Sequence, residues 1–178
     1  MTSGINFQSL NTFSLRNSSI TSLGVVPAEG EPGIFDASHF PNISSLRKVS
    51  INDYGVVSYS QFTFQETNIV TINNLNWSGT GEYLFYNCTK LAHINGAITL
   101  KTSANHMFWR CQALEALPTI TADSSLTVAS YMFAGANLLS YNAVAAVIRA
   151  CTNVTTFDHA FFCKKFDDNT DINLTTLF

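Results

Sequence analysis

The chain has 178 residues and a net charge of −3, and 46% of its residues are hydrophobic while only 12% are charged. This length suffices for one domain of ordinary size with a sizeable core. The basic residues pair only at Arg47-Lys48 and Lys164-Lys165, which argues against nucleic-acid binding because that needs a concentrated basic stripe. The apolar runs are short and interrupted, so we expect no membrane-spanning segment.

Residues 1–37 carry no clean copy of the repeat that fills the rest of the chain. Within them, residues 27–33 form a turn-rich break through their Pro and Gly content. We predict that residues 1–37 form an N-terminal cap or an attachment arm. The opening residues lack the basic region and the continuous apolar stretch of a secretory signal. The chain therefore either has lost such a signal or does not use that route.

Residues 38–166 repeat a pattern of Phe at position zero, a small residue at +3, and apolar residues at +6 and +9. Two copies fit fully, and they are Phe85, Cys88, Leu91, Ile94 and Phe108, Cys111, Leu114, Leu117. Further copies start at Phe40 (with Val49 at +9), Phe64 and Phe133 (with Leu139 at +6), and a variant copy starts at Ile148. The steps between the Phe residues are 24, 21, 23 and 25 residues.

Self-similarity at this period predicts an α/β solenoid of the leucine-rich-repeat kind. We expect a right-handed coil of short parallel strands joined by short helices or turns, with 21–25 residues per repeat. Positions zero and +3 should share one side of a turn, and residues 91–96 and 114–119 should pass into strands. The predicted core ladder consists of Phe40, Phe64, Phe85, Phe108, Phe133, Cys88, Cys111, Leu91, Leu114 and Leu139.

Cysteines occupy the +3 position of the two full copies. Free Cys behaves as a small hydrophobe, so Cys88 and Cys111 fit buried positions where neighbouring units approach closely. A disulfide between equivalent positions of adjacent units is the alternative. A zinc site is disfavoured, because no Cys-x-x-Cys pair exists and the 23-residue spacing is the repeat itself.

The stretch 142–151 is Ala-rich and carries apolar residues at helical spacing. We predict a helix there, with Asn142 as its cap, in place of the turn of one repeat. Residues 167–178 are predicted to form the C-terminal cap.

No catalytic motif stands out. The chain has no His-Glu-x-x-His pair, no Gly-x-Ser-x-Gly turn and no phosphate-binding loop. Asp158 and His159 are neighbours in sequence, but adjacency alone makes no acid–base pair. The acidic residues Asp167, Asp168 and Asp171 lack the glycine and the bidentate Glu of a calcium loop. We therefore predict no catalytic residue, no metal site, no cofactor and no enzyme activity.

Aromatic residues supply the candidate contact positions, because Tyr and Trp offer large contact area at low entropic cost. The candidates are Trp77, Trp109, Tyr83, Tyr86, Tyr131 and Tyr141. Counting +8 from each repeat start predicts an outward row on the sheet, made of Lys48, Ile72, His93, Ala116, Tyr141 and Thr156. The predicted ligand face consists of Lys48, His93, Tyr141 and Trp109, with solvent exposure as the plain alternative.

The sequence pattern of the repeats resembles the BspA-type leucine-rich repeat of bacterial surface proteins. The pairs Met107-Phe108 and Met132-Phe133 also resemble related repeats in mycoplasma lipoproteins and in phage tail or head proteins. The resemblance covers about residues 38–166, and it implies adhesion or surface display rather than catalysis.

On these grounds we expect a non-enzymatic interaction protein on a surface. Among such proteins the Met-Phe spelling, the short chain beginning at Met and the lack of an export signal favour a phage virion component, as head decoration, head fibre or tail-associated protein. A bacterial cell-surface adhesin, or a fragment of one, is the alternative. A glycan-acting hydrolase would need converging acids, which share no repeat position. Expected partners are other proteins of a virion or cell surface, host glycans or a receptor, within a larger assembly.

Overall fold

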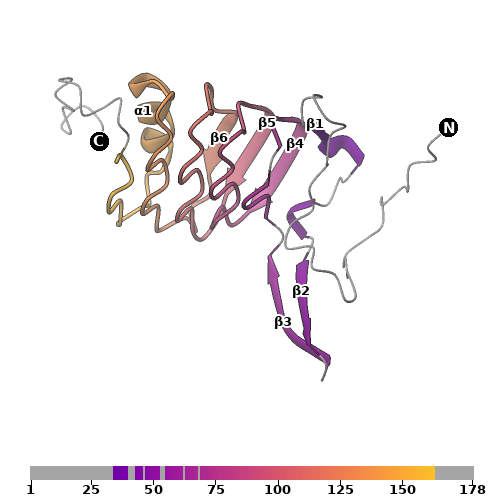
Figure 1. Cartoon of the computed structure of the whole chain (residues 1–178). Helices are drawn as coiled ribbons and strands as arrows, with labels where there is room; N and C mark the ends of the chain where they lie inside the picture. The colour runs from indigo at the N-terminus through magenta and orange to yellow at the C-terminus, as the bar shows by residue number, and fades with distance from the viewer. Residues whose placement is uncertain are drawn as a thin grey trace.

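The structure, a computed structural model, describes residues 34–39, 43–45, 47–52, 55–61, 63–67 and 69–162. Four strands form a parallel sheet in the order β1-β4-β5-β6 (Figure 1). The strands of that sheet are β1 (Ile34–Asp36), β4 (Thr71–Gly79), β5 (His93–Leu100) and β6 (Thr119–Ala122). The remaining elements are two 3-10 helices (Ala37–His39 and Ile43–Ser45), the hairpin strands β2 (Arg47–Asn52) and β3 (Gly55–Gln61), and the helix α1 (Tyr141–Ala150).

One face of the parallel sheet is apolar, because the strands alternate between buried and solvent-facing side chains. Trp77, Ile98 and Ile120 are paired across the three strands β4, β5 and β6, and all three are buried. The residues before and after these three in their strands are exposed or half-buried, and they are Asn76, Ser78, Ala97, Thr99, Thr119 and Thr121. The small polar residues among them account for a sheet that remains hydrated on its outer face despite the low charge of the chain.

Strand β4 contains one residue more than β5 between two matched pairs. Ile72 lies opposite Ile94, but Leu75 lies opposite Gly96. Asn74 takes up the extra length in the left-handed region, with φ 56°. Gly96 has φ 147°, and a Cβ there would lie 2.1 Å from the carbonyl oxygen of Leu75. Only glycine therefore fits at position 96, where the two backbones approach most closely.

Consecutive turns, not helices, carry the repeat pattern on the side opposite the strands. Within one unit, the Cys88 amide donates to the carbonyl of Phe85 at 3.1 Å, and the Leu91 amide donates to Cys88 at the same distance. Between units, the Phe85 amide donates to the carbonyl of Met107 at 2.9 Å. Positions zero, +3 and +6 therefore mark successive turns, and each unit hydrogen-bonds to the next.

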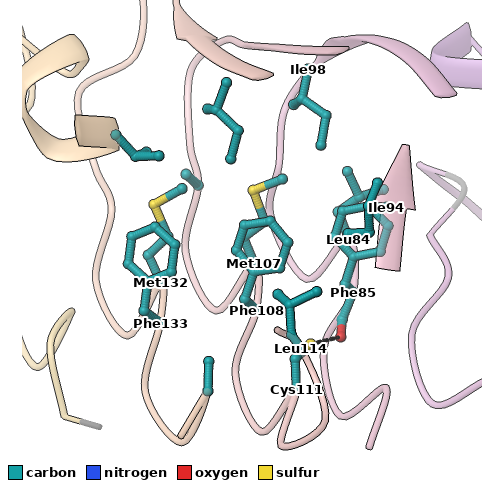
Figure 2. Close-up of a cluster of buried hydrophobic side chains, with 14 of the residues drawn as sticks. Leu84, Phe85, Ile94, Ile98, Met107, Phe108, Cys111, Leu114, Met132 and Phe133 are labelled. Atoms are coloured by element: carbon teal, nitrogen blue, oxygen red, sulfur yellow. Dashed lines mark hydrogen bonds between the residues drawn. The ribbon is translucent and has the colours of Figure 1, made fainter. Parts of the chain in front are cut away.

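The Phe residues of these turns form a column through the core (Figure 2). Phe64, Phe85, Phe108 and Phe133 are fully buried, with neighbouring ring centroids 5.6, 5.3 and 5.6 Å apart and ring planes within 11° of parallel. The other described residues of the predicted ladder are buried too, namely Cys88, Cys111, Leu91, Leu114 and Leu139. Phe40 lies outside the described residues.

Val49, the +9 residue of the predicted repeat at Phe40, does not lie in the parallel sheet as the repeat pattern predicts. Strand β2 pairs antiparallel with β3 in a separate two-stranded hairpin, so Val49 does not belong to the parallel sheet. The strand beside β4 is β1, which precedes Phe40 in the chain. The sequence Asn-Asp-Tyr-Gly at 52–55 explains the difference, because Asn, Asp and Gly favour a tight reversal of the chain.

The predicted caps lie largely outside the described residues. Residues 1–33 and 163–178 are not described, so the C-terminal cap and most of the N-terminal segment remain predictions. Strand β1 falls within the segment predicted as cap or arm, yet it already pairs in parallel with β4.

The strand expected at 114–119 begins only at Thr119, where β6 starts. The preceding residues remain attached to the neighbouring unit through one bond, in which the Glu115 amide donates to the carbonyl of Ala92 at 3.2 Å. Pro118 stands immediately before β6 and has no amide hydrogen to donate, which explains the late start of the strand.

The helix α1 differs from the prediction in its cap and in its place. Its N-cap is Ser140, whose hydroxyl accepts a 3.3 Å hydrogen bond from the Ala143 amide, and not Asn142. It follows the turns of the Phe133 unit where the other units enter a strand, so it replaces a strand and not a turn. Ile148 is a buried helix residue and starts no repeat. The chain rejoins the stack at Thr156, which bridges in parallel to Val128.

Candidate binding surface on the turns

Two residues before Phe85, Phe108, Phe133 and Phe161, the turns carry a ring that stacks on the ring of the neighbouring unit. These rings form what we call the ring column, which consists of Tyr83, His106, Tyr131 and His159. Successive centroids lie 4.9, 4.9 and 4.8 Å apart, and the planes deviate by at most 10°. The spacing follows the stacking of the units, since each unit supplies one ring.

All four rings sit on residues in the left-handed region, with φ between 51° and 55°. This conformation is unusual for residues other than glycine and asparagine. The turn maintains it through bonds between units, such as that from the Tyr83 amide to the carbonyl of Asn105 at 2.9 Å. Stacking of the rings contributes further, because an aromatic pair stabilises by about 0.5–1.5 kcal/mol beyond its burial.

His106 and Tyr131 are stacked on both faces by their neighbours, so these two rings have only their edges left for other contacts. Tyr83 is 37% exposed, and the His159 side chain bonds Asp158, with Nδ1 2.6 Å from the carboxylate. His106 is more enclosed, and its Nδ1 has no hydrogen-bond partner among the described residues. Burial lowers the pKa of His106, against a weaker opposing effect of the charge on Glu82.

A second, incomplete row runs beside the ring column, one residue after each core Phe. Tyr86 contacts Trp109 at 4.6 Å between centroids, and the guanidinium carbon of Arg110 lies 4.6 Å from the Trp109 ring centre. The next unit has only Ala134 at this place, and the unit after it has Phe162, which is 70% exposed.

The small residues of the middle unit leave a hollow, which we call the slot. Its lining comprises Trp109, Arg110, Gln112, Tyr131, Ala134, Gly135, Asn137, His159 and Phe162. Gly135 has φ 77°, and a Cβ on it would lie 3.4 Å from the backbone of Arg110. Because Tyr131 and His159 belong to both, the ring column and the slot form one continuous surface, and its lining includes the cation Arg110.

The residues predicted as a ligand face come from different elements. Lys48 belongs to the hairpin strand β2, and Tyr141 is the first residue of α1, partly buried against the core. His93 begins β5, where its imidazole is 3.9 Å from the carboxylate of Glu115. Of the four, Trp109 alone lines the slot.

The outward row predicted by counting +8 is wrong in its register. The residue opposite His93 on β4 is Thr71, while Ile72 lies opposite Ile94 and is fully buried. Trp77, expected as a contact residue, is also fully buried, and its indole N–H donates to the carbonyl of Thr80 at 3.1 Å.

The described cysteines are free thiols. The Cys111 thiol donates to the carbonyl of Phe85 at 3.0 Å, and the Cys88 thiol donates to Phe64 at 2.9 Å (Figure 2 shows the first). Burial raises the pKa of both thiols, and it raises that of Cys151 to about 11. Cys88 and Cys111 therefore link adjacent units through hydrogen bonds and not through a disulfide.

Sequence reasoning missed the ring column as a unit. Its signal was present, because a Tyr or His stands two residues before Phe85, Phe108, Phe133 and Phe161. The slot left a signal too, in the small pair Ala134-Gly135 at the place of Trp109-Arg110. Among the described residues no three His, Cys, Asp or Glu side chains are grouped to hold a metal ion. Within that part of the chain no helix is long and apolar enough to cross a membrane.

The stacked units, the parallel sheet and the buried Phe column define a repeat protein of the α/β class. The model of the BspA type leucine rich repeat region matches residues 8–140 in six copies, so the chain belongs to that family, as its spelling predicts. The match begins upstream of residue 38, where we expected the repeats to start. No curated protein and no solved structure matches the chain. Membership of this family indicates a role in protein interaction or at a surface.

Proposed function

We propose that the protein is a non-enzymatic binding module displayed on a surface, and that it binds through the ring column and the slot. The observation that carries this proposal is the continuous run of stacked rings on the turns, beside which Trp109 and Phe162 stand on either side of an open hollow. Aromatic side chains gathered on one surface are characteristic of binding sites, because they bury large areas with little loss of entropy.

The scaffold supports this role because it holds the surface rigidly. Three rings of the column, Tyr83, His106 and Tyr131, belong to residues whose amides donate to carbonyls of the next unit at 2.8–2.9 Å. The buried Phe residues of the same turns hold them against the core by packing on one another. A surface that is ordered before binding loses little entropy when it captures a ligand, which favours affinity.

For the coil as a whole we propose a right-handed solenoid. Successive strands of its sheet are parallel and adjacent, and connections between such strands are right-handed in about 98% of cases. An experimental structure with left-handed connections would reject this part of the proposal.

Among surface proteins, we infer a phage virion component, as head decoration, head fibre or tail-associated protein. The Met-Phe spelling at Met107 and Met132 supports this, together with a polar surface built from amides and hydroxyls. Mass spectrometry of purified virions should detect the protein, and antibody labelling should place it on their exterior. Its presence only in a bacterial envelope fraction would support the second candidate, a cell-surface adhesin, which the family membership favours.

The binding surface is tested by two matched variants. Trp109→Ala removes a ring from the turn side, and His93→Ala removes a ring from the exposed face of the sheet. Binding of the purified protein to intact host cells should fall with the first variant and stay unchanged with the second. The opposite outcome would assign binding to the sheet face. Circular dichroism and a thermal midpoint confirm that both variants fold.

A further inference from the structure

The slot is one unit wide, and its two walls are aromatic. Trp109 and Phe162 hold the same place in their turns, with Ala134 of the intervening unit between them. In the ring column, the rings of successive units are 4.9 and 4.8 Å apart, so Trp109 and Phe162 belong to turns two such steps apart. A ligand with a single flat or puckered ring fits this space.

Glycine keeps the slot open. A side chain at position 135 would extend from a backbone with φ 77° and lie against Arg110, because even its Cβ would be 3.4–3.6 Å from that residue. Asn87 and Arg110 occupy the equivalent place in the two preceding units, at φ 56° and 58°. The turn thus accepts a side chain there in other units, while the unit that forms the slot has none.

The charge in the slot belongs to Arg110. Its guanidinium lies against the Trp109 ring, and within the described part of the chain it forms no ion pair. The nearby carboxylate of Asp158 bonds His159 instead. A guanidinium offers a planar fork of donors that matches a carboxylate, so the slot is complementary to an anionic group beside a ring.

Besides Arg110, the polar residues of the lining are Gln112, Asn137, Tyr131 and His159, and the first two carry amides. Gln112 and Asn137 both line the slot, and amides both donate to and accept from hydroxyl groups. Aromatic walls that can pack against a ring, amides that can bond hydroxyls and one guanidinium together describe a ring that carries hydroxyls and a carboxylate.

From these groups we infer that the slot binds a carboxylated sugar residue of an acidic glycan. The sugar ring packs between Phe162 and the pair formed by Trp109 and Arg110, its carboxylate pairs with the Arg110 guanidinium, and its hydroxyls bond the amides of Gln112 and Asn137. This inference rests on the proposed function and specifies its ligand. A polynucleotide is disfavoured as the ligand, because its phosphates need several cations, whereas the slot holds one arginine and the chain has a net charge of −3.

The test uses the full chain and two matched pairs of sugars. The first pair is a short galacturonic acid oligomer and its fully methyl-esterified form, and the second is sialyllactose and lactose. Saturation-transfer NMR and titration calorimetry should detect binding of at least one acidic member and of neither neutral member. Raising the salt from about 50 mM to about 500 mM should weaken that binding, because the charge pair is accessible to screening.

Variants then locate the site. Trp109→Ala and Arg110→Gln should each weaken binding of the acidic sugar by about tenfold or more, whereas His93→Ala should leave it unchanged. Equal binding of acidic and neutral sugars, or full binding by Arg110→Gln, would overturn the inference. Loss of host-cell binding in Trp109→Ala without any sugar binding would also overturn it, and would leave the proposed function standing with a protein ligand.

Discussion

Replacing Phe108 with alanine removes a middle ring of the buried column. The ring is fully buried and stacks on both sides, against Phe85 at 5.3 Å and against Phe133 at 5.6 Å. A buried Phe→Ala change costs about 3–5 kcal/mol, and the loss of two aromatic pairs places this one in the upper part of that range, about 4–5 kcal/mol. Urea unfolding followed by circular dichroism measures the change in the free energy of unfolding.

Two control variants separate stacking from other causes. Phe108→Leu keeps most of the volume and should cost only about 1–1.5 kcal/mol. Phe162→Ala removes a ring that is 70% exposed, and it should change stability by no more than about 0.5 kcal/mol. The reasoning would be refuted if Phe108→Ala lowered the free energy of unfolding by less than about 2 kcal/mol while the slope of that free energy against urea concentration stayed unchanged. The Phe column would then not be what stabilises the stacked units.

Gly96→Ala should destabilise the protein by at least about 2 kcal/mol in urea, since it combines backbone strain with a clash against the carbonyl of Leu75; a neutral result would show that the two strands can separate there at little cost. Cys111 should resist thiol reagents in the native protein and react once unfolded, because burial raises the pKa of its thiol, and rapid labelling of the native protein would contradict its burial. Burial lowers the pKa of His106 below its ordinary value of 6.5, so the unfolded chain binds more protons just below that pH. The part of the stability that depends on neutral His106 is then fully present above pH 6.5. It is lost as the pH falls through that value towards the pKa of His106 in the folded protein. Urea midpoints at about pH 7.5 and about pH 5.5 should differ less in His106→Gln than in the wild type, and an equal difference in both would exclude His106 as the cause.

Sequence patterns predicted the parts of the fold that depend on short spacings. The steps from Phe85 to Cys88 and from Cys88 to Leu91 are each closed by one turn hydrogen bond, so the same spacing recurs wherever the turn recurs. The burial of the Phe residues follows from this regularity, and so does the family assignment.

Predictions that depended on counting across a whole unit were less successful. The bulge at Asn74 adds one residue to β4, and the paired strand residues Ala97 and Thr119 are 22 apart while Phe85 and Phe108 are 23 apart. The eighth residue after each Phe therefore does not occupy equivalent positions in successive strands. The hairpin and the helix α1 are insertions whose place depends on the neighbouring units, which no local pattern records.

The slot was the least predictable feature, because it is defined by side chains that are missing. Ala134 and Gly135 look unremarkable in a chain rich in small residues. Their meaning emerges only when Trp109 and Phe162, which are 53 positions apart in the sequence, are seen to face the same hollow. The small size of Ala134 and Gly135 indicates a hollow only when they are compared with Trp109 and Arg110, which hold the same places in the preceding unit.

The helix α1 also limits how copies of this protein can join. Strand β6 ends the parallel sheet, and α1 packs beside it where a further strand would pair (Figure 1). A helix satisfies its own backbone groups, so it offers no template on which a foreign strand can add. Addition of a strand from a second copy is therefore blocked at this edge of the sheet, and the protein cannot polymerise into fibres through it.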